Sequence, residues 1–201
     1  MTTQRIRQHI STLPLGTPFS VGMFLSMGSR AAVDQALSRL VQAGTITRVT
    51  RGVFVRPREN FYLGKLAPEP ASVAKLLAAE SGAVLEVHGA EAARRFGRST
   101  QMPTQAVYYT SGPTRRRRLG KLQVTMKHVS PRYMKLAGTQ AGAALSAFRY
   151  LGKRQVTQEV VRAVKAKLAP AEFERLVSAP EAMPGWLAAA VRAQAEPARH
   201  G

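Results

Sequence analysis

Apolar residues recur at intervals of three and four positions between residues 29 and 43, which predicts an amphipathic helix. The positions on its apolar face are Val33, Ala36, Leu37, Leu40 and Val41. Ser29 precedes this pattern, and its hydroxyl can accept a hydrogen bond from an amide of the first turn. Gly44 follows the pattern and can adopt the left-handed conformation that ends a helix. We therefore expect a capped helix whose apolar face packs inward.

Beyond Gly44 the period of the apolar residues shortens to two, which is typical of strands. The residues that fit two short strands are Ile46, Arg48, Val53 and Val55, with a turn at 50–52. Upstream, residues 3–12 and 19–25 each predict a short helix. Helices followed by a hairpin, in this order, predict a winged helix-turn-helix over residues 1–57, with residues 29–43 as its recognition helix.

Residues 58–70 predict a connector to the rest of the chain, because two prolines lie near its C-terminal end. Phe61 and Tyr62 are its large side chains. We expect these two aromatic residues to dock the two parts of the chain together rather than to stack on bases.

Residues 71–196 predict a mixed α/β domain with a helical C-terminus, so the expected fold class is α+β. Its first half predicts helices at 72–80 and 90–96 and strands at 83–88, 106–110 and 119–128. Its second half predicts helices at 139–151, 157–168, 170–177 and 184–195. A loop at 111–118 is expected to join the last two strands.

Four arginines end this loop, namely Arg115, Arg116, Arg117 and Arg118. Adjacent like charges repel one another, and a phosphate or a carboxylate would relieve that repulsion. The run therefore predicts either a second anion contact or a solvated loop, and the sequence leaves both open.

The charge of the chain indicates which class of partner it binds. Among 201 residues, 30 Lys and Arg stand against 11 Asp and Glu, which gives a formal net charge of +19 and a pI near 11.5. Such an excess predicts a polyanionic partner, of which nucleic acid is the obvious one. A membrane surface is the rival, but the sequence has no apolar run of about 18 residues and no signal peptide. The absence of cysteine rules out disulfides and agrees with a cytoplasmic protein.

The outer face of the recognition helix predicts contacts with DNA. Arginine can pair bidentately with guanine and glutamine with adenine, so Arg30 and Gln35 are the first candidates for reading bases. The candidates for the phosphate backbone are the basic residues at the border of this face and on the hairpin, namely Arg39, Arg48, Arg51 and Arg56. The alternative is a plain solvated helix. A binding module for RNA or for an acidic protein is the alternative at the level of function.

Catalytic signals are weak in this chain. Asp34 is its only aspartate, so metal-dependent chemistry that needs paired aspartates has no basis. The histidines at positions 9, 88, 128 and 200 lack the spacing of metal ligands, and phosphate-binding, nucleophile-elbow and dinucleotide motifs are missing. We therefore expect a protein that is not an enzyme and needs no cofactor or metal. A nuclease that uses Glu86, His88 and Glu91 is the weakest alternative.

Three stretches of the chain resemble one known family. They are LPLGTPFS at 13–20, GSRAAVDQALSRLVQAGTITRVTRGVFVRP at 28–57 and VHGAEAARRFGRSTQMPTQAVYYTSGPTRRRRLGKLQV at 87–124. These residues are similar to the AbiEi antitoxins of bacterial type IV toxin-antitoxin and phage-defence systems, in particular to the short DUF6088-like branch. The resemblance extends to about Leu168.

This resemblance implies a function and a set of contacts. The N-terminal domain would bind inverted repeats in its own operon promoter, and the C-terminal domain would counteract an AbiEii nucleotidyltransferase toxin. The residues implied in base contacts are Ser29, Arg30, Gln35 and Ser38. Arg48 and Arg51 would contact the backbone. Antitoxins of this type need not touch their toxin, so the resemblance does not imply a direct complex.

Overall fold

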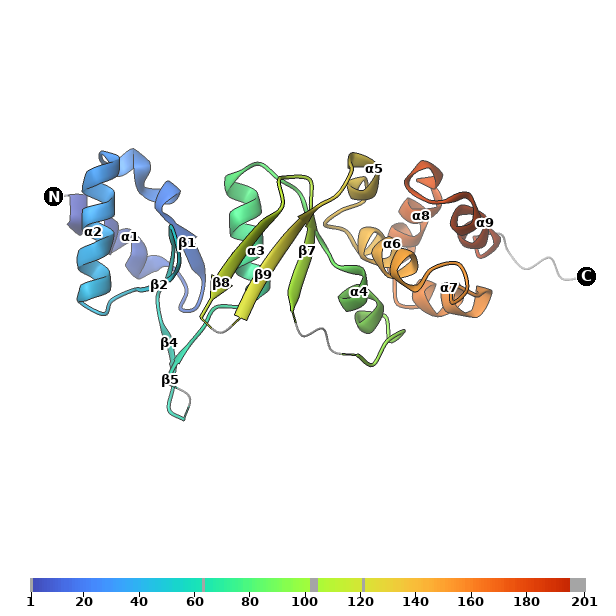
Figure 1. Cartoon of the computed structure of the whole chain (residues 1–201), viewed down its shortest axis with the longest axis horizontal. Coiled ribbons are helices and arrows are strands. Elements are labelled where there is room, and N and C mark those ends of the chain that lie inside the picture. The colour runs from blue at the N-terminus through green and yellow to red at the C-terminus, as the bar shows by residue number, and fades with distance from the viewer. Residues whose placement is uncertain (1, 63, 102–104, 121, 196–201) are drawn as a thin grey trace, which may run out of the picture. The chain divides into compact units, whose positions relative to one another are not determined.

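The computed structural model describes residues 2–62, 64–101, 105–120 and 122–195 (Figure 1). The described residues form two compact units, one drawn from 1–82 and 116–124 and the other from 83–115 and 125–201. The sequence instead predicts a connector at 58–70 and a second domain from residue 71. Helices and small sheets alternate along the chain, so the prediction of an α+β fold class is confirmed.

The first unit begins with the elements of a winged helix. Its helices are α1 (Thr2–Thr12), the 3-10 helix η1 (Val21–Met27) and α2 (Arg30–Gln42). Its sheet has the order β1-β3-β2, formed by β1 (Pro18–Ser20), β2 (Thr47–Thr50) and β3 (Val53–Val55), and both pairs are antiparallel. Ile6, Phe24, Leu37 and Leu40 are at most 1% exposed and form the centre of its core.

Both predicted caps of α2 are confirmed. The Ser29 hydroxyl accepts a hydrogen bond from the backbone N–H of Ala32 at 3.3 Å. At the other end, Gly44 has φ +71°, which a residue without a β-carbon adopts at little cost. Because both ends are fixed, the register of the exposed face of α2 is fixed as well.

The segment 19–25, expected as a helix, has a different structure. Pro18–Ser20 is strand β1, and only Val21–Met27 is helical, as a 3-10 helix. The strand forms because this segment pairs with a segment that lies far away in the sequence. Phe19 lies opposite Phe54 in the register of β1 and β3. The two rings stack with their centroids 6.1 Å apart, and Phe19 is 1% exposed.

The segment 58–70, expected as a connector, contains an antiparallel hairpin of β4 (Arg58–Asn60) and β5 (Gly64–Leu66). Helix α3 (Pro70–Glu80) follows and belongs to the first unit. Phe61 and Tyr62, expected to dock the two parts of the chain together, are 95% and 88% exposed at the hairpin tip and do not pack into the core of the first unit, and their docking stays a prediction. Asn60 lies opposite Gly64 in the register of β4 and β5, so Phe61 and Tyr62 lie beyond the last residue pair of the two strands.

The second unit combines most of a sheet with helices. The sheet has the order β6-β7-β9-β8, formed by β6 (Leu85–Val87), β7 (Ala106–Thr110), β8 (Arg115–Leu119) and β9 (Leu122–His128). The helices are α4 (Gly89–Arg95), α5 (Pro131–Met134), α6 (Gln140–Leu151), α7 (Gln158–Lys165), α8 (Pro170–Val177), the 3-10 helix η2 (Pro180–Ala182) and α9 (Gly185–Ala193). The predicted helical C-terminus is confirmed, with Leu145, Phe148 and Leu176 at its buried centre.

Two glycines allow close approaches to α6. A β-carbon on Gly89 would lie 2.6 Å from the carbonyl oxygen of Ser146. A β-carbon on Gly142 would lie 2.0 Å from the carbonyl oxygen of Leu136, which is far inside van der Waals contact. Helices α4 and α6 can therefore pack against their neighbours only because these positions carry no side chain.

None of the helices that the structure describes combines the length and the apolar composition needed to cross a membrane.

Candidate nucleic-acid interface

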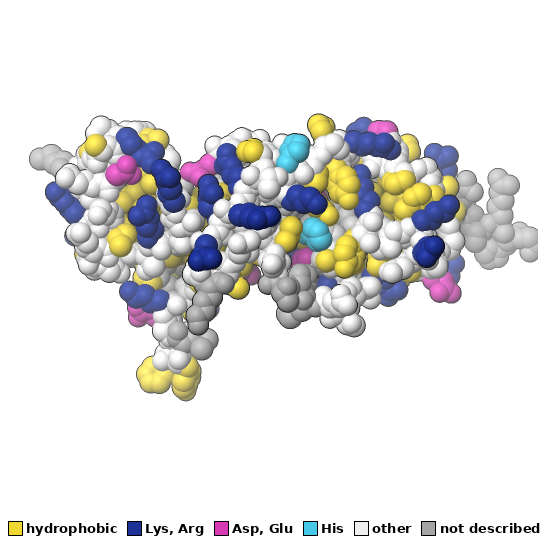
Figure 2. Space-filling model, in the orientation of Figure 1, with side chains coloured by type: hydrophobic (Ala, Val, Ile, Leu, Met, Phe, Trp, Pro, Cys, Tyr) yellow, Lys and Arg dark blue, Asp and Glu magenta, His cyan; other side chains and the backbone are white. Residues whose placement is uncertain are grey.

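The outer face of α2 is open to solvent. Ser29, Arg30, Gln35 and Ser38 are all exposed, whereas Val33, Ala36, Leu37 and Leu40 on the opposite face are at most 1% exposed. This division follows from the helical period of the apolar residues. Figure 2 shows Lys and Arg side chains gathered around the part of the first unit that carries α2.

Four of the predicted DNA contacts line one hollow. Its volume is about 390 Å³, and it lies between α2 and the hairpin of β2 and β3, which we call the wing. Arg30 and Ser38 of α2 and Arg48 and Arg51 of the wing lie on its sides, together with Asp34. The fold thus brings together residues up to 21 positions apart in the sequence. We call this site the α2–wing hollow.

The charges of the α2–wing hollow are unbalanced. Three arginines and one carboxylate line it. The Nε of Arg30 donates a hydrogen bond to Oδ2 of Asp34 at 2.9 Å, and the two side chains are 64% and 51% exposed. An exposed pair of this spacing contributes only about 0.3–0.5 kcal/mol to stability. The remaining positive charge attracts an anion to the mouth of the hollow.

The arginines of the wing are positioned by its sheet. The guanidinium of Arg48 lies over the ring of Phe54, 6.0 Å from its centroid. Arg51 occupies the exposed turn, where the following Gly52 has φ +76°. The turn itself is tied to η1, because the backbone N–H of Val21 donates to the carbonyl of Gly52 at 3.1 Å. The positions of Arg48 and Arg51 relative to α2 are therefore fixed.

The other candidates for backbone contacts differ in their surroundings. Arg39 is exposed in the last turn of α2. Arg56 is half-buried, and its Nη1 donates hydrogen bonds to the carbonyls of Ser11 at 2.7 Å and Leu13 at 2.5 Å. These bonds fasten the end of β3 to the end of α1. Arg56 therefore has a role in holding the fold together, and its contact with the DNA backbone stays a prediction.

The expected loop at 111–118 is partly a strand. Arg115 to Arg118 form most of β8, an edge strand of the sheet, and the expected strand at 119–128 begins only at Leu122. In a strand, adjacent side chains point to opposite faces, which separates the charges that a loop would crowd together. Arg116 and Arg118 are exposed, while Arg115 and Arg117 are half-buried. Cationic side chains on an edge strand also discourage pairing with other chains.

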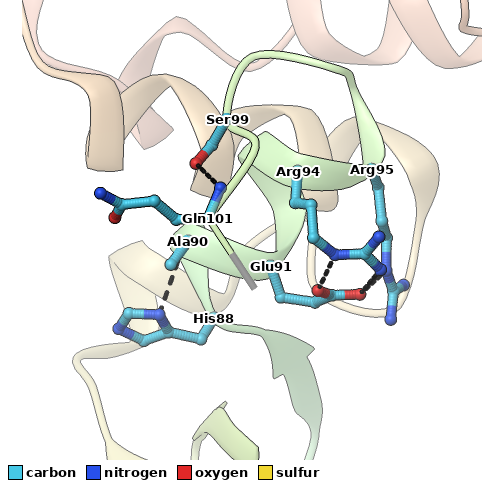
Figure 3. A network of polar contacts seen from close by, with 7 residues as sticks. All are labelled: His88, Ala90, Glu91, Arg94, Arg95, Ser99 and Gln101. Atoms are coloured by element: carbon cyan, nitrogen blue, oxygen red, sulfur yellow. Dashed lines mark hydrogen bonds and ion pairs between the residues drawn. The ribbon is translucent and has the colours of Figure 1, made fainter. Parts of the chain in front are cut away.

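The residues of the nuclease alternative serve local structure, and Figure 3 shows two of them, His88 and Glu91. His88 caps α4, since its Nδ1 accepts from the backbone N–H of Ala90 at 3.3 Å. Glu91 accepts hydrogen bonds from Arg94 and Arg95 at 2.7–2.9 Å, and these bonds lower the pKa of its carboxyl. Glu86 is buried and accepts from the backbone N–H groups of Val87 and Gly138, and burial raises its pKa.

Glu86, His88 and Glu91 therefore each form hydrogen bonds with different partners. The described residues contain no cluster of three His, Asp or Glu side chains that could hold a metal ion. Near His88, the ring of Tyr109 lies 4.9 Å away, and burial with the neighbouring Tyr133 raises the pKa of Tyr109 to about 12. A phenol with that pKa stays protonated near neutral pH and does not act as a base.

Replacing His88 with Asn should reduce the loss of stability in acid. Burial, followed by the charge of Lys127, lowers the pKa of His88 below its ordinary 6.5. The contribution of His88 to stability is therefore present above pH 6.5 and lost as the pH falls through its folded-state pKa. Asparagine also caps helices but does not titrate. Thermal unfolding between about pH 7.5 and 5 should show a smaller drop in Tm for His88→Asn, and equal drops would contradict this role of His88.

Sequence patterns missed two features near this site. Strand β1 is only three residues long, too short for a period to be seen. The hairpin that presents Phe61 and Tyr62 did carry a signal, because Asn60 and Gly64 are typical turn residues on either side of the aromatic pair.

The model of DUF6088, described as a family of unknown function, matches residues 5–176. No curated protein and no solved structure matches the chain.

Proposed function

The chain belongs to the DUF6088 family, a family of unknown function, and we propose that it binds duplex DNA, as its geometry supports, and represses its own operon, as its likeness to AbiEi antitoxins supports. By the same likeness, the operator is expected to consist of inverted repeats in the promoter of that operon. Helix α2 would enter the major groove, and the wing would contact the phosphate backbone beside it.

The α2–wing hollow is the observation that carries this proposal. A recognition helix must expose side chains that can reach base edges, and a wing must offer cations to phosphates. The hollow combines Arg30 and Ser38 of the helix with Arg48 and Arg51 of the wing. Gln35 is exposed on the same helix. Phosphates bound in and around the hollow would neutralise its excess positive charge.

Titration with three ligands tests this proposal. The ligands are a duplex from the chain's own promoter, a scrambled duplex of equal composition and a structured RNA. We expect the promoter duplex to bind about a thousandfold more tightly than the scrambled one. Log affinity should fall with log salt with a slope of about 0.9 for each phosphate neutralised. If the RNA binds most tightly at physiological salt, the chain is an RNA-binding module instead.

A second part of the proposal concerns the cellular role. The likeness of residues 13–57 and 87–124 to AbiEi antitoxins supports a type IV antitoxin that counteracts an AbiEii-type nucleotidyltransferase. The test is growth of cells that express the neighbouring nucleotidyltransferase gene with and without this chain. Rescue of growth by both the wild type and Arg30→Ala, which should bind the promoter more weakly, would separate the antitoxin role from repression. Absence of rescue by the wild type would contradict the antitoxin role.

Replacing Asp34 with Asn is expected to tighten binding to all duplexes. Asp34 is the one carboxylate that lines the α2–wing hollow, and it also holds the Nε of Arg30. Removing its charge from a site that faces phosphates should lower Kd roughly fivefold on promoter and scrambled DNA alike. Glu174→Gln is the matched control, because Glu174 is an exposed acid of α8 in the second unit. If both variants lower Kd equally, the gain in affinity comes from the net charge of the chain and not from the position of Asp34 in the hollow.

A further inference from the structure

The tip of the β4–β5 hairpin exposes the largest apolar side chains at the surface of the first unit. Phe61 is 95% exposed and Tyr62 88% exposed, whereas the other exposed large hydrophobic side chains that the structure describes reach at most 56%. Figure 2 shows hydrophobic side chains gathered at the far end of the hairpin. Burial of such rings away from water is favourable in free energy, and the core of the first unit does not include them.

The tip has a defined geometry. Oδ1 of Asn60 accepts a hydrogen bond from the backbone N–H of Tyr62 at 2.9 Å, and Gly64 closes the turn with φ +67°. The rings of Phe61 and Tyr62 meet edge to face, with centroids 5.2 Å apart and planes at 88°. Only one of two perpendicular rings can lie parallel to a given base pair. The other ring is left to fill the groove beside it.

The root of the hairpin adjoins the wing. Lys65 and Leu66 of β5 line a small cavity of about 200 Å³ together with Arg48 and Val49 of β2. From this root, three residues of strand extend the hairpin by roughly 10 Å. The tip and the α2–wing hollow therefore belong to the same compact unit. A duplex is large enough to contact both.

The charge around the tip favours one class of partner. Residues 1–82 and 116–124 contain 14 Lys and Arg and 4 Asp and Glu. In the hairpin itself, Arg58 and Lys65 outnumber the single acid Glu59. The partner must therefore be anionic and must also offer flat apolar faces to aromatic rings. A DNA duplex has both properties, with phosphates on its outside and base pairs that can be parted at flexible steps.

We infer that Phe61 and Tyr62 form a wedge that enters the minor groove of bound DNA, inserts between base pairs and bends the duplex. This inference rests on the proposed function, because the wedge acts on DNA that α2 and the wing already hold. Apolar side chains of other minor-groove proteins kink DNA in this way. The bend would bring more of the duplex onto the basic surface of the first unit.

The double variant Phe61→Ala/Tyr62→Ala tests the wedge. The probe is the promoter duplex, labelled at both ends for energy transfer and carrying 2-aminopurine as a reporter of unstacking. Wild-type protein should shorten the distance between the ends and raise the 2-aminopurine fluorescence. The double variant should bind about tenfold or more weakly and lose both signals, since stacking of one aromatic ring on a base has an effect of that size. Its Tm should be unchanged because both side chains are exposed.

Leu25→Ala is the matched control, since Leu25 is a 45% exposed apolar residue of the same unit. This variant should bind and bend DNA like the wild type. If the wild type binds the promoter duplex and the double variant binds and bends it equally well, the wedge is wrong and the proposed function stands. If the wild type does not distinguish the promoter from the scrambled duplex, the proposed function fails, and the wedge fails with it.

Discussion

Replacing Gly142 with Ala should destabilise the second unit by about 3 kcal/mol or more, which corresponds to a fall in Tm of roughly 10 °C. The added β-carbon would lie 2.0 Å from the carbonyl oxygen of Leu136 and 2.5 Å from Oε2 of Glu86. The first of these atoms belongs to the backbone and cannot rotate away. The clash should therefore exceed the gain of about 1 kcal/mol that Ala brings over Gly inside a helix.

Gly185→Ala is the control for this prediction. Gly185 begins α9, and a β-carbon built there has no atom within 4 Å. That variant should be neutral or slightly more stable, because only the preference of helices for Ala acts on it. Both variants are measured by thermal and urea unfolding. A Tm for Gly142→Ala equal to that of Gly185→Ala would mean that α6 does not approach Leu136 as closely as described.

The second large effect concerns recognition of DNA. Arg30→Ala should cost about 1–3 kcal/mol of binding on the promoter duplex and much less on the scrambled one, because a bidentate contact with guanine is lost. Arg51→Ala should weaken binding to both duplexes alike and reduce the salt slope by about one phosphate. The difference follows from position, since Arg30 lies in the first turn of α2 and Arg51 in the turn of the wing.

Gel-shift titrations of the two variants on both duplexes provide this comparison. Arg162→Ala, an exposed arginine of α7 in the second unit, is the control for loss of one positive charge. It should leave the ratio of the two affinities unchanged. If Arg30→Ala lowers affinity for promoter and scrambled DNA by the same factor, α2 does not read bases through this residue.

The local patterns of the sequence were sufficient to predict α2 and the residues that cap it. The apolar period placed the buried face, and Ser29 and Gly44 fixed the two ends of the helix, as the hydrogen bond to Ala32 and the positive φ show. From that register alone, the exposure of Gln35 and Ser38 could be predicted. Periodicity is a local property, so it predicts a face well whenever a helix is long enough.

Features that depend on distant residues could not be predicted in the same way. Strand β1 exists because Phe19 meets Phe54, which is 35 positions later in the chain. Arg56 is fixed by carbonyls of Ser11 and Leu13, 45 and 43 positions away. Local charge alone gives no indication that an arginine donates to distant carbonyl groups instead of remaining in solvent.

The arginine run illustrates a different limit. Four adjacent arginines resemble a loop in composition, yet Arg115 to Arg118 pair as an edge strand of the sheet. Strand geometry sends neighbouring side chains to opposite faces, so the repulsion that argues for a loop is reduced once the strand forms. The hairpin of β4 and β5 was missed for a simpler reason, since strands of three residues are too short to show alternation.

The central claim is that the outer face of α2 meets the bases of duplex DNA, and site-directed cleavage tests it most directly. The chain contains no cysteine, so Gln35→Cys can be labelled uniquely with an iron chelate that cuts nearby DNA. Gln8→Cys is the control, because Gln8 lies on the exposed side of α1, away from the buried Ile6 and Ile10. The label at position 35 is predicted to cut the promoter duplex at a few defined steps, and the label at position 8 to cut weakly or not at all. Cleavage that is equal from both positions, or absent from position 35 while the protein remains bound, would contradict the account.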